Sequence, residues 1–274
     1  MKDVFEVPVL SAAARRMATQ DEIAEITTIA GRAVAVLLAG APRFLSRHEP
    51  TGAIAYSRES PPDLNLAFIL PTGDGPRLLA EAASLAREAG HAAAVLLVGV
   101  AAEMLSSEAA RLGLPRVATI TLMALEPVVA IPTPRPCHVL RADTPALRTA
   151  SGDIVAAAFH LPRPAVAAAL DSAPGGPGGA ELFLGAINDR IETAASIVRA
   201  GATAGIWCVG TVPAAERRGH SSALLAALIE RYRTEGVTRF YLYATAAGRP
   251  VYERLGFRAL ADVAMHLVAP PNRT

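Results

Sequence analysis

Lysine and cysteine are the residues that this sequence has least of. Of its 26 basic residues only Lys2 is a lysine, and the arginines that remain form no long basic run at a net charge of +1. Non-specific nucleic-acid binding needs clustered cations, so we expect no nucleic-acid partner. The two cysteines, Cys137 and Cys208, are too few and too far apart for a disulfide framework or a zinc site. We expect buried thiols and no metal.

Long apolar runs are missing as well. The longest, residues 92–102, is too short to cross a bilayer, although 52% of the residues are hydrophobic. Asp3 and Glu6 follow Lys2 at once, with no clean apolar core before a small-residue cleavage site, so a secretory signal is not predicted. We therefore expect a cytoplasmic protein without a membrane partner.

The chain is long enough for two domains, because 274 residues exceed the usual length of one. Residues 126–136, EPVVAIPTPRP, contain four prolines, which lack a backbone donor and favour extended conformations. We predict a linker there and a division near residue 135, into domains 1–134 and 135–274. A second Pro/Gly cluster, residues 172–180, is predicted to be a mobile loop inside the second domain.

The two halves repeat one α/β unit. RLLAEAASLAREAG (residues 77–90) aligns with ALLAALIERYRTEG (223–236), and an apolar strand follows each segment. Further on, ARLGLPR (110–116) aligns with ERLGFR (253–258), and both run into a last strand. The long period indicates duplicated domains and not a solenoid.

Periodicity in the second half predicts alternating strands and helices. Strands are expected at residues 138–141, 182–188, 192–199, 205–212, 239–244 and 257–268, and helices at 145–160, 164–170, 221–235 and 249–255. Asn188 and Asp189 suit a hairpin turn. In the helix at 221–235, Leu225, Leu228 and Tyr232 share one face, which predicts packing on a sheet.

The stretch TVPAAERRGHSSALLAAL (residues 211–228) joins a strand to that helix through small and basic residues. Gly219, Ser221, Ser222 and Ala223 leave the backbone N–H groups of the helix start uncovered, and the helix dipole adds positive potential. Arg217 and Arg218 can add charge-assisted contacts, and His220 is expected to face solvent beside them. This pattern predicts a phosphate-binding loop. A serine-capped helix start with solvated arginines is the alternative.

Two motifs resemble those of the GNAT superfamily of N-acetyltransferases. RGHSSA (residues 218–223) is similar to the family's acyl-CoA loop, Arg/Gln-x-x-Gly-x-Gly/Ala, and YERLGF (252–257) resembles a segment common in its later helix. One helix and one strand separate the motifs. The resemblance covers about residues 138–268, and the internal repeat extends it to the first half. It implies an α/β (α+β) fold of two tandem GNAT-like domains, each a mixed, mostly antiparallel sheet flanked by helices.

The resemblance also implies residue roles. Acetyl-CoA would be the co-substrate and an amine the acceptor, attacking the thioester directly, while Tyr252 protonates the leaving thiolate or stabilises its charge. The residues implied for acetyl-CoA are Val209, Gly210 and Thr211, through their backbone to the pantetheine, and Arg217, Arg218, Gly219, His220, Ser221, Ser222 and Ala223, to the pyrophosphate. Ser221 replaces a glycine of the family pattern, and its hydroxyl still offers a donor.

The sequence allows more than one role for Tyr252 and does not identify a general base. Tyr252 could instead be a packing residue, and the chain a non-catalytic acyl-CoA-binding or regulatory module that keeps the GNAT fold. No general base is predicted, because the strand at 205–212 has no carboxylate. Glu181, Glu192 and His160 are expected to be solvated or helix-terminal, and Cys208 is expected in the core. Homo-oligomers are compatible with the sequence.

The first half lacks the residues of this chemistry. Its loop, PTGDGPRLL (residues 71–79), has a threonine in place of the arginine, an aspartate that adds negative charge, and a proline without an N–H. Ala109 occupies the place of Tyr252. We predict a degenerate, non-catalytic copy that binds no CoA alone and forms one wall of the acceptor site.

Overall fold

The structure is a computed structural model that describes residues 18–59, 61–126, 136–171, 173, 175 and 178–270. Most of the predicted linker at 126–136 lies outside the described residues, as does much of the Pro/Gly loop predicted at 172–180. Within the described ranges, no helix has the length and apolar character to cross a membrane.

The first half places one long helix before a run of strands and helices. Its elements are α1 (Gln20–Leu38), β1 (Leu45–Glu49), β2 (Gly52–Tyr56), η1 (Pro62–Leu64), β3 (Asn65–Ile69), α2 (Gly75–Ala89), β4 (Ala93–Val98), α3 (Ala101–Met104), α4 (Ser106–Arg111) and β5 (Arg116–Leu125).

The second half repeats this order with one additional strand at its start. Its elements are β6 (His138–Arg141), α5 (Pro145–Phe159), α6 (Arg163–Val166), the π-helical turn η2 (Ala167–Asp171), β7 (Ala180–Ile187), β8 (Arg190–Ala200), β9 (Thr203–Thr211), η3 (Pro213–Ala215), α7 (His220–Thr234), β10 (Arg239–Ala244), α8 (Arg249–Arg254) and β11 (Arg258–Val268). The strands predicted for this half and three of its four predicted helices are present, with shifts of at most two residues at the ends. The helix predicted at 164–170 is instead the short α6 followed by the π-helical turn η2.

Local sequence signals set several of these boundaries. Thr144 caps α5 by accepting a hydrogen bond from the amide of Leu147 at 3.3 Å, and a proline follows at the first helical position. Asn188 and Asp189 both have positive φ (51° and 62°), as a tight two-residue hairpin requires. The predicted β7–β8 hairpin turn is therefore confirmed.

The internal repeat is visible in matching helix ends. The amide of His91 bonds the carbonyl of Ala86 after α2, and the amide of Val237 bonds that of Tyr232 after α7. In both halves two strands pair antiparallel and the next pairs parallel, as β2, β3 and β4 in the first and β8, β9 and β10 in the second. The two halves are therefore copies of one supersecondary unit.

The two copies share a single eleven-stranded sheet because their last strands are exchanged. The strand order is β1-β2-β3-β4-β11-β5-β10-β9-β8-β7-β6, so β11 of the second half pairs with β4, and β5 of the first half pairs with β10. A mixed, mostly antiparallel sheet flanked by helices is confirmed. The division predicted near residue 135 lies between β5 and β6 along the chain, but the sheet contains strands from both sides of it, and residues 1–134 alone would lack β11.

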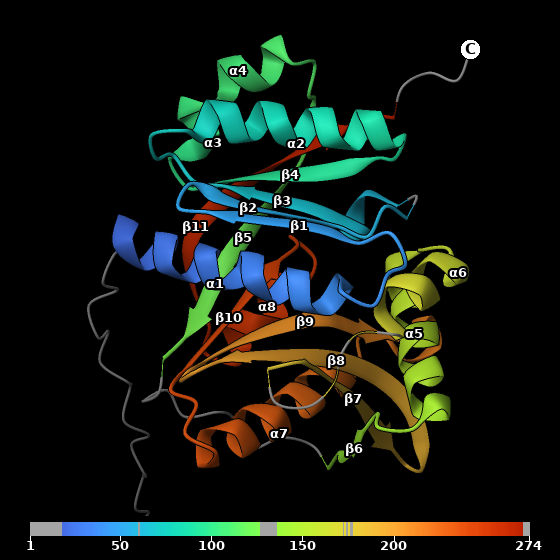
Figure 1. The fold of residues 1–274 in the computed structure, drawn as a ribbon. Helices are drawn as coiled ribbons and strands as arrows, with labels where there is room; N and C mark the ends of the chain where they lie inside the picture. Colours follow the sequence, from blue (N-terminus) through green and yellow to red (C-terminus); the bar gives the residue numbers. More distant parts are fainter. Residues whose placement is uncertain are drawn as a thin grey trace, which may run out of the picture.

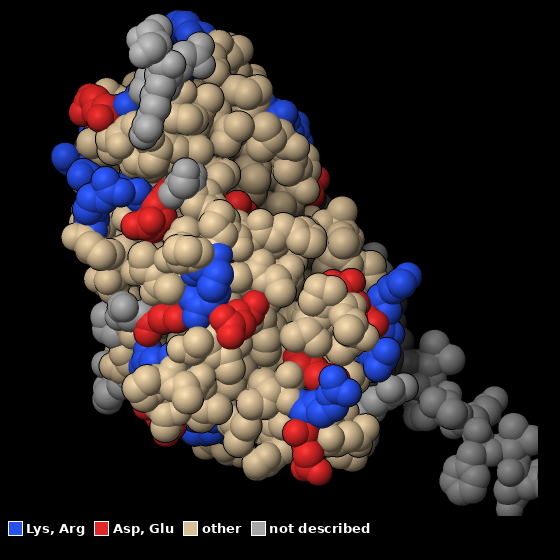
Figure 2. All heavy atoms as spheres, turned by 90° about the vertical axis from the view of Figure 1, so that its right-hand side faces the viewer, with Lys and Arg blue, Asp and Glu red and all other residues tan. Residues whose placement is uncertain are grey.

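Helices cover both faces of this sheet (Figure 1). On one face α1 and α5 pack with Phe68, Leu96 and Ile120 in one core cluster. On the other face α2 packs over the first-half strands and α7 over the second-half strands. Figure 1 shows α1 lying between the first-half strands and β8 and β9. Figure 2 shows one side of the molecule, where charged side chains of both signs lie in separate small groups among uncharged surface.

All five tyrosines of the chain have a raised pKa, with burial as the largest cause. An unfolded tyrosine ionises near pH 10, so above that pH the unfolded state holds fewer protons and stability falls as pH rises. We expect tyrosinate absorbance to stay low until the fold is lost, and then to rise in one step together with the change in circular dichroism. A gradual titration centred at pH 10 with intact structure would contradict this burial.

Candidate functional site

A bulge in β9 opens the sheet beside its neighbour β10. Trp207 pairs with Ser196 and Gly210 with Ala194, so β9 carries one extra residue between them, where Cys208 has φ 50°. The parallel pairing of β9 with β10 ends at Gly205. The following part of β9 has no ladder to β10, which leaves its backbone polar groups available to an extended ligand. Val209, Gly210 and Thr211, whose backbone the resemblance assigns to the pantetheine, lie in this part of β9.

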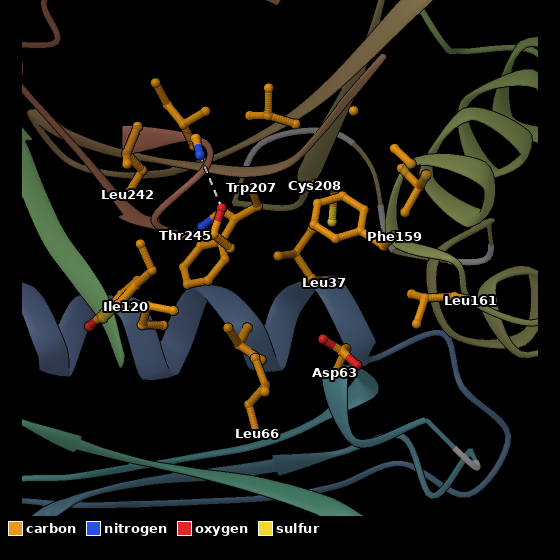
Figure 3. A pocket seen from close by; sticks show the side chains of 18 of the residues that line it. Leu37, Asp63, Leu66, Ile120, Phe159, Leu161, Trp207, Cys208, Leu242 and Thr245 are labelled. Carbon is orange, nitrogen blue, oxygen red and sulfur yellow. Dashed lines mark hydrogen bonds between the residues drawn. The ribbon is translucent and has the colours of Figure 1, made fainter. Parts of the chain in front are cut away.

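A cavity of about 630 Å³ lies in this opening and is lined by both halves. Leu37 on α1, Leu66 on β3 and Ile120 on β5 line it from the first half. Trp207, Phe159 at the end of α5, and Leu161 line it from the second (Figure 3). The volume is in the range of small-molecule sites. The first half therefore forms part of this cavity wall.

Tyr252 on α8 lines the same cavity. Its ring packs edge-on against Phe257 with 6.0 Å between the centroids, and burial raises the pKa of its hydroxyl to about 12. The hydroxyl has no hydrogen-bond partner among the described residues. The phenol therefore keeps its proton at neutral pH and has that proton available to a molecule in the cavity.

The phosphate-binding loop that the sequence predicts borders a second cavity, of about 940 Å³. Arg217 and Gly219 have positive φ (60° and 82°), and α7 begins directly after them. Such alternating backbone conformations turn successive N–H groups towards one concavity, and the first helical N–H groups lack intrahelical partners. A glycine is favoured at position 219 because its φ lies in the left-handed region. The arrangement can hold an anion.

Four arginines line this second cavity: Arg190, Arg217, Arg218 and Arg254. Ser221, Ser222 and Ala223 line it from the first turn of α7. The two cavities share Thr211, Arg217, Ser221 and Ala247 in their linings, so they adjoin, and we call the pair the groove. Arginines line one end of the groove, and the bulged strand and Tyr252 line the other end.

The structure corrects the prediction for His220, which does not face solvent. Its side chain is buried, and Nδ1 lies 2.9 Å from Oε2 of Glu192 on β8. Glu192 is not solvated either, since its side chain is 12% exposed. The carbonyl of Glu192 also accepts a hydrogen bond from the amide of Val212 at 2.9 Å. The His220–Glu192 pair therefore links the first residue of α7 to β8.

Removing this buried partner should destabilise the fold. Glu192→Ala leaves the His220 ring without its carboxylate, and we expect the free energy of unfolding to fall by about 1–3 kcal/mol. Denaturant unfolding measures the change, with Glu216→Ala, an exposed carboxylate near the same loop, as the matched control. Equal stability of the two variants would show that the pair does not anchor the helix.

The other candidate groups have structural partners. Glu181 contacts the Tyr232 hydroxyl and lies 2.9 Å from Arg141, so its predicted solvation is wrong. His160 is exposed at the end of α5 with φ 54°, as its predicted helix-terminal position requires. Cys208 lines the first cavity and burial raises its thiol pKa to about 11, so it stays a thiol at neutral pH. Among the described residues, no three His, Cys, Asp or Glu side chains gather as a metal site.

The equivalent loop of the first half holds its arginine in ion pairs. Arg77 contacts Glu49 and lies 2.9 Å from Glu81. Ala109, in the place of Tyr252, is fully buried. Carboxylates of β1 and α2 therefore surround Arg77 beside this loop, whereas arginines line the cavity at the equivalent loop of the second half.

Three further residues line the cavities without having been predicted from the sequence: Asp63, Arg190 and Tyr243. Asp63 and Tyr243 line the first cavity from η1 and from β10, and neither lies in a recognisable motif. Arg190 follows the predicted Asn188-Asp189 turn, so its place beside the loop required knowing how β8 runs. Spatial proximity alone identifies these residues.

Comparison with known proteins gives a consistent assignment. The family described as "Acetyltransferase (GNAT) domain" matches residues 197–260. No curated protein matches the chain. A GCN5-related N-acetyltransferase from Kribbella flavida is similar in structure, with a TM-score of 0.63, 18% identity, and 90% of this chain and 96% of that chain covered.

A tandem GNAT protein from the clavulanic acid biosynthesis pathway is similar over 93% of this chain and 98% of that chain, with a TM-score of 0.55 and 17% identity. A GCN5-related N-acetyltransferase from Sphaerobacter thermophilus is similar over 93% of this chain and 95% of that chain, with a TM-score of 0.55 and 15% identity. These likenesses concern the fold of nearly the whole chain, and the matched domain carries both motifs. The GNAT domain family therefore matches residues 197–260, and the fold of nearly the whole chain, with both repeats, is similar to that of a tandem GNAT protein.

Proposed function

We propose that this protein transfers the acetyl group of acetyl-CoA to an amine at the groove of the second half. The observation that carries the proposal is that two cavities adjoin, one lined by the four arginines and the start of α7 and the other by the bulged β9 and Tyr252. CoA is an extended molecule with a pyrophosphate at one end and a thiol at the other. A cation-rich end joined to a largely apolar end beside an unpaired strand edge matches that polarity.

Each part of the groove has a role in this proposal. Amides of residues 219–222 with Arg217 and Arg218 hold the pyrophosphate. Backbone groups of Val209, Gly210 and Thr211 bond the pantetheine amides along the open edge of β9. This arrangement carries the thioester to the cavity that Tyr252 lines.

The chemical step is direct attack. The amine nitrogen bonds to the thioester carbonyl carbon, the C–S bond breaks, and the amine proton passes to solvent. The pKa of Tyr252, about 12, lies above the roughly 8.5 of an ordinary thiol. Tyr252 therefore acts by donating a hydrogen bond to the developing thiolate, and full proton transfer to sulfur is completed by water.

Thiol release separates this activity from acyl-CoA binding without catalysis. The protein is incubated with acetyl-CoA and a panel of amines, amino acids and aminoglycosides, and free CoA thiol is measured beside the melting temperature with CoA. We expect CoA to raise the melting temperature and at least one amine to accelerate thiol release. Thermal protection without amine-dependent release from any member of the panel would favour the binding module.

A further inference from the structure

We propose that the acceptor is a primary amine carried on an apolar, aromatic body, which lies in the cavity between the two halves. This inference rests on the proposed function, since it names the substrate class of the same groove. It assigns a binding role to the first half, whose own loop lacks the residues for acetyl-CoA.

Apolar side chains from both halves line much of the cavity. Leu37, Leu66, Ile120, Phe159 and Leu161 present aliphatic or aromatic surface to it from both halves (Figure 3). Burying apolar surface here is favourable by roughly 25 cal/mol per Å². Hydroxyl groups of a sugar or backbone groups of a peptide would lose water against these side chains without gaining hydrogen bonds. This apolar part of the cavity therefore disfavours the hydroxyl groups of aminoglycosides and the backbone groups of peptide chains.

Aromatic rings form one wall of the cavity. Tyr243 lies 6.0 Å from Trp207, with an angle of 30° between the rings, and 5.4 Å from Phe68, with an angle of 54°. All three residues line the cavity. Ring pairs at such distances gain energy beyond area burial, so an aromatic guest adds a favourable contact that an aliphatic chain of the same area does not.

Few charged residues line the cavity. The charged residues among the described lining are Asp63, Glu216 and Arg217, and the last two belong to the loop that leads to the pyrophosphate site. Asp63 is the charge contributed by the first half. It is exposed at η1, and Figure 3 shows its carboxylate turned towards the cavity. A carboxylate at the border between solvent and cavity attracts an ammonium ion.

The segment that carries Asp63 is held in place by a buried side chain. Asn65 is fully buried, and its Nδ2 donates to the carbonyls of Pro61 and Ala92, each at 3.0 Å. Its Oδ1 accepts from the amide of Arg58 at 2.8 Å. Arg58 and Pro61 are therefore tied to the strand that follows them, which holds the short η1 and its Asp63 in place.

An apolar cavity also explains how the amine becomes a nucleophile. Desolvation disfavours an ammonium ion and lowers the pKa of an amine that leaves the water at Asp63 for the cavity interior. The neutral form, which attacks the thioester, is thus favoured without a dedicated carboxylate on β9. The order would be capture of the cation at Asp63, loss of its proton to water, and attack by the neutral amine.

Calorimetry on the full chain saturated with CoA tests the acceptor class without needing turnover. The probes are 2-phenylethylamine, ethanolamine and 2-phenylethanol. We expect 2-phenylethylamine to bind at least tenfold more tightly than ethanolamine, which lacks the ring. Asp63→Asn should weaken the binding of 2-phenylethylamine several-fold and leave the binding of 2-phenylethanol unchanged. Asp74 is an exposed first-half carboxylate outside the cavity, so Asp74→Asn should change the affinity for neither probe.

Thiol release from acetyl-CoA then distinguishes the two proposals. Faster thiol release with 2-phenylethylamine than with ethanolamine would support both the acetyl transfer and the apolar acceptor. Equal or faster thiol release with ethanolamine would support the transferase activity but contradict the proposal of an apolar acceptor. Displacement of bound 2-phenylethylamine by decanoyl-CoA would also contradict that proposal, because the cavity would then be a site for the acyl chain. Binding of 2-phenylethylamine without release with any amine overturns the transferase, and the bound amine is then no acceptor.

Discussion

Tyr252→Phe is expected to lower kcat by roughly 10²- to 10³-fold while acetyl-CoA affinity and fold are kept. The ring still packs against Phe257, but the hydroxyl of this cavity-lining residue is gone, so in the proposed mechanism the thiolate forms without its hydrogen-bond donor. Steady-state kinetics with a competent amine measures the loss, and calorimetry measures the affinity.

Tyr232→Phe is the matched control for this result. Tyr232 lies on α7 with its hydroxyl bonded to Glu181 and outside the cavity lining, so its loss should reduce stability but not kcat. Because the pKa of Tyr252 is about 12, its protonated form persists as pH rises, and kcat should show no alkaline decline attributable to it below about pH 11. A phenylalanine variant with the parental kcat would remove Tyr252 from the mechanism.

Arg218→Glu is expected to weaken acetyl-CoA binding at least tenfold. The substitution replaces a cation beside the α7 N-terminus with a carboxylate, so attraction for the pyrophosphate becomes repulsion. Calorimetry gives the dissociation constant, and Arg116→Glu, the same charge change at an exposed first-half arginine, should leave it unchanged. An Arg218→Glu protein that folds and binds acetyl-CoA with parental affinity would place the pyrophosphate elsewhere.

The sequence was sufficient for the repeat and for the elements of the second half, because both depend on local patterns. Apolar residues spaced along 221–235 predict a helix that packs by one face, and Leu225, Leu228 and Tyr232 are buried in α7. The loop motif likewise placed Gly219 directly before that helix. Helical periodicity and turn chemistry are encoded within a few residues of each element.

The exchange of β5 and β11 was not predictable in this way. Both segments read as apolar strands at the end of a repeat, and a strand pattern does not specify which neighbour it pairs with. Pairing of β11 with β4 joins residues more than 160 apart in the sequence, such as Val263 and Val98. The first-half wall of the cavity depends on this shared sheet.

Burial of the His220–Glu192 pair was missed for a related reason. A histidine beside two arginines in a loop suggests solvent exposure, and the sequence does not reveal that β8 passes beneath the start of α7. Asp63 was missed because its importance comes from the cavity it borders and not from its neighbours in the chain. Contacts across the fold, and not local propensity, determine these residues.

The most direct test of one intact and one degenerate repeat is the number of acetyl-CoA molecules that bind each chain. Isothermal titration of the full-length protein should give a stoichiometry of one, because Arg218 and its neighbours line the groove of the second half whereas the first-half loop presents Asp74, Glu49 and Glu81 around Arg77. A stoichiometry of two would contradict this account by showing that the first half also binds acetyl-CoA.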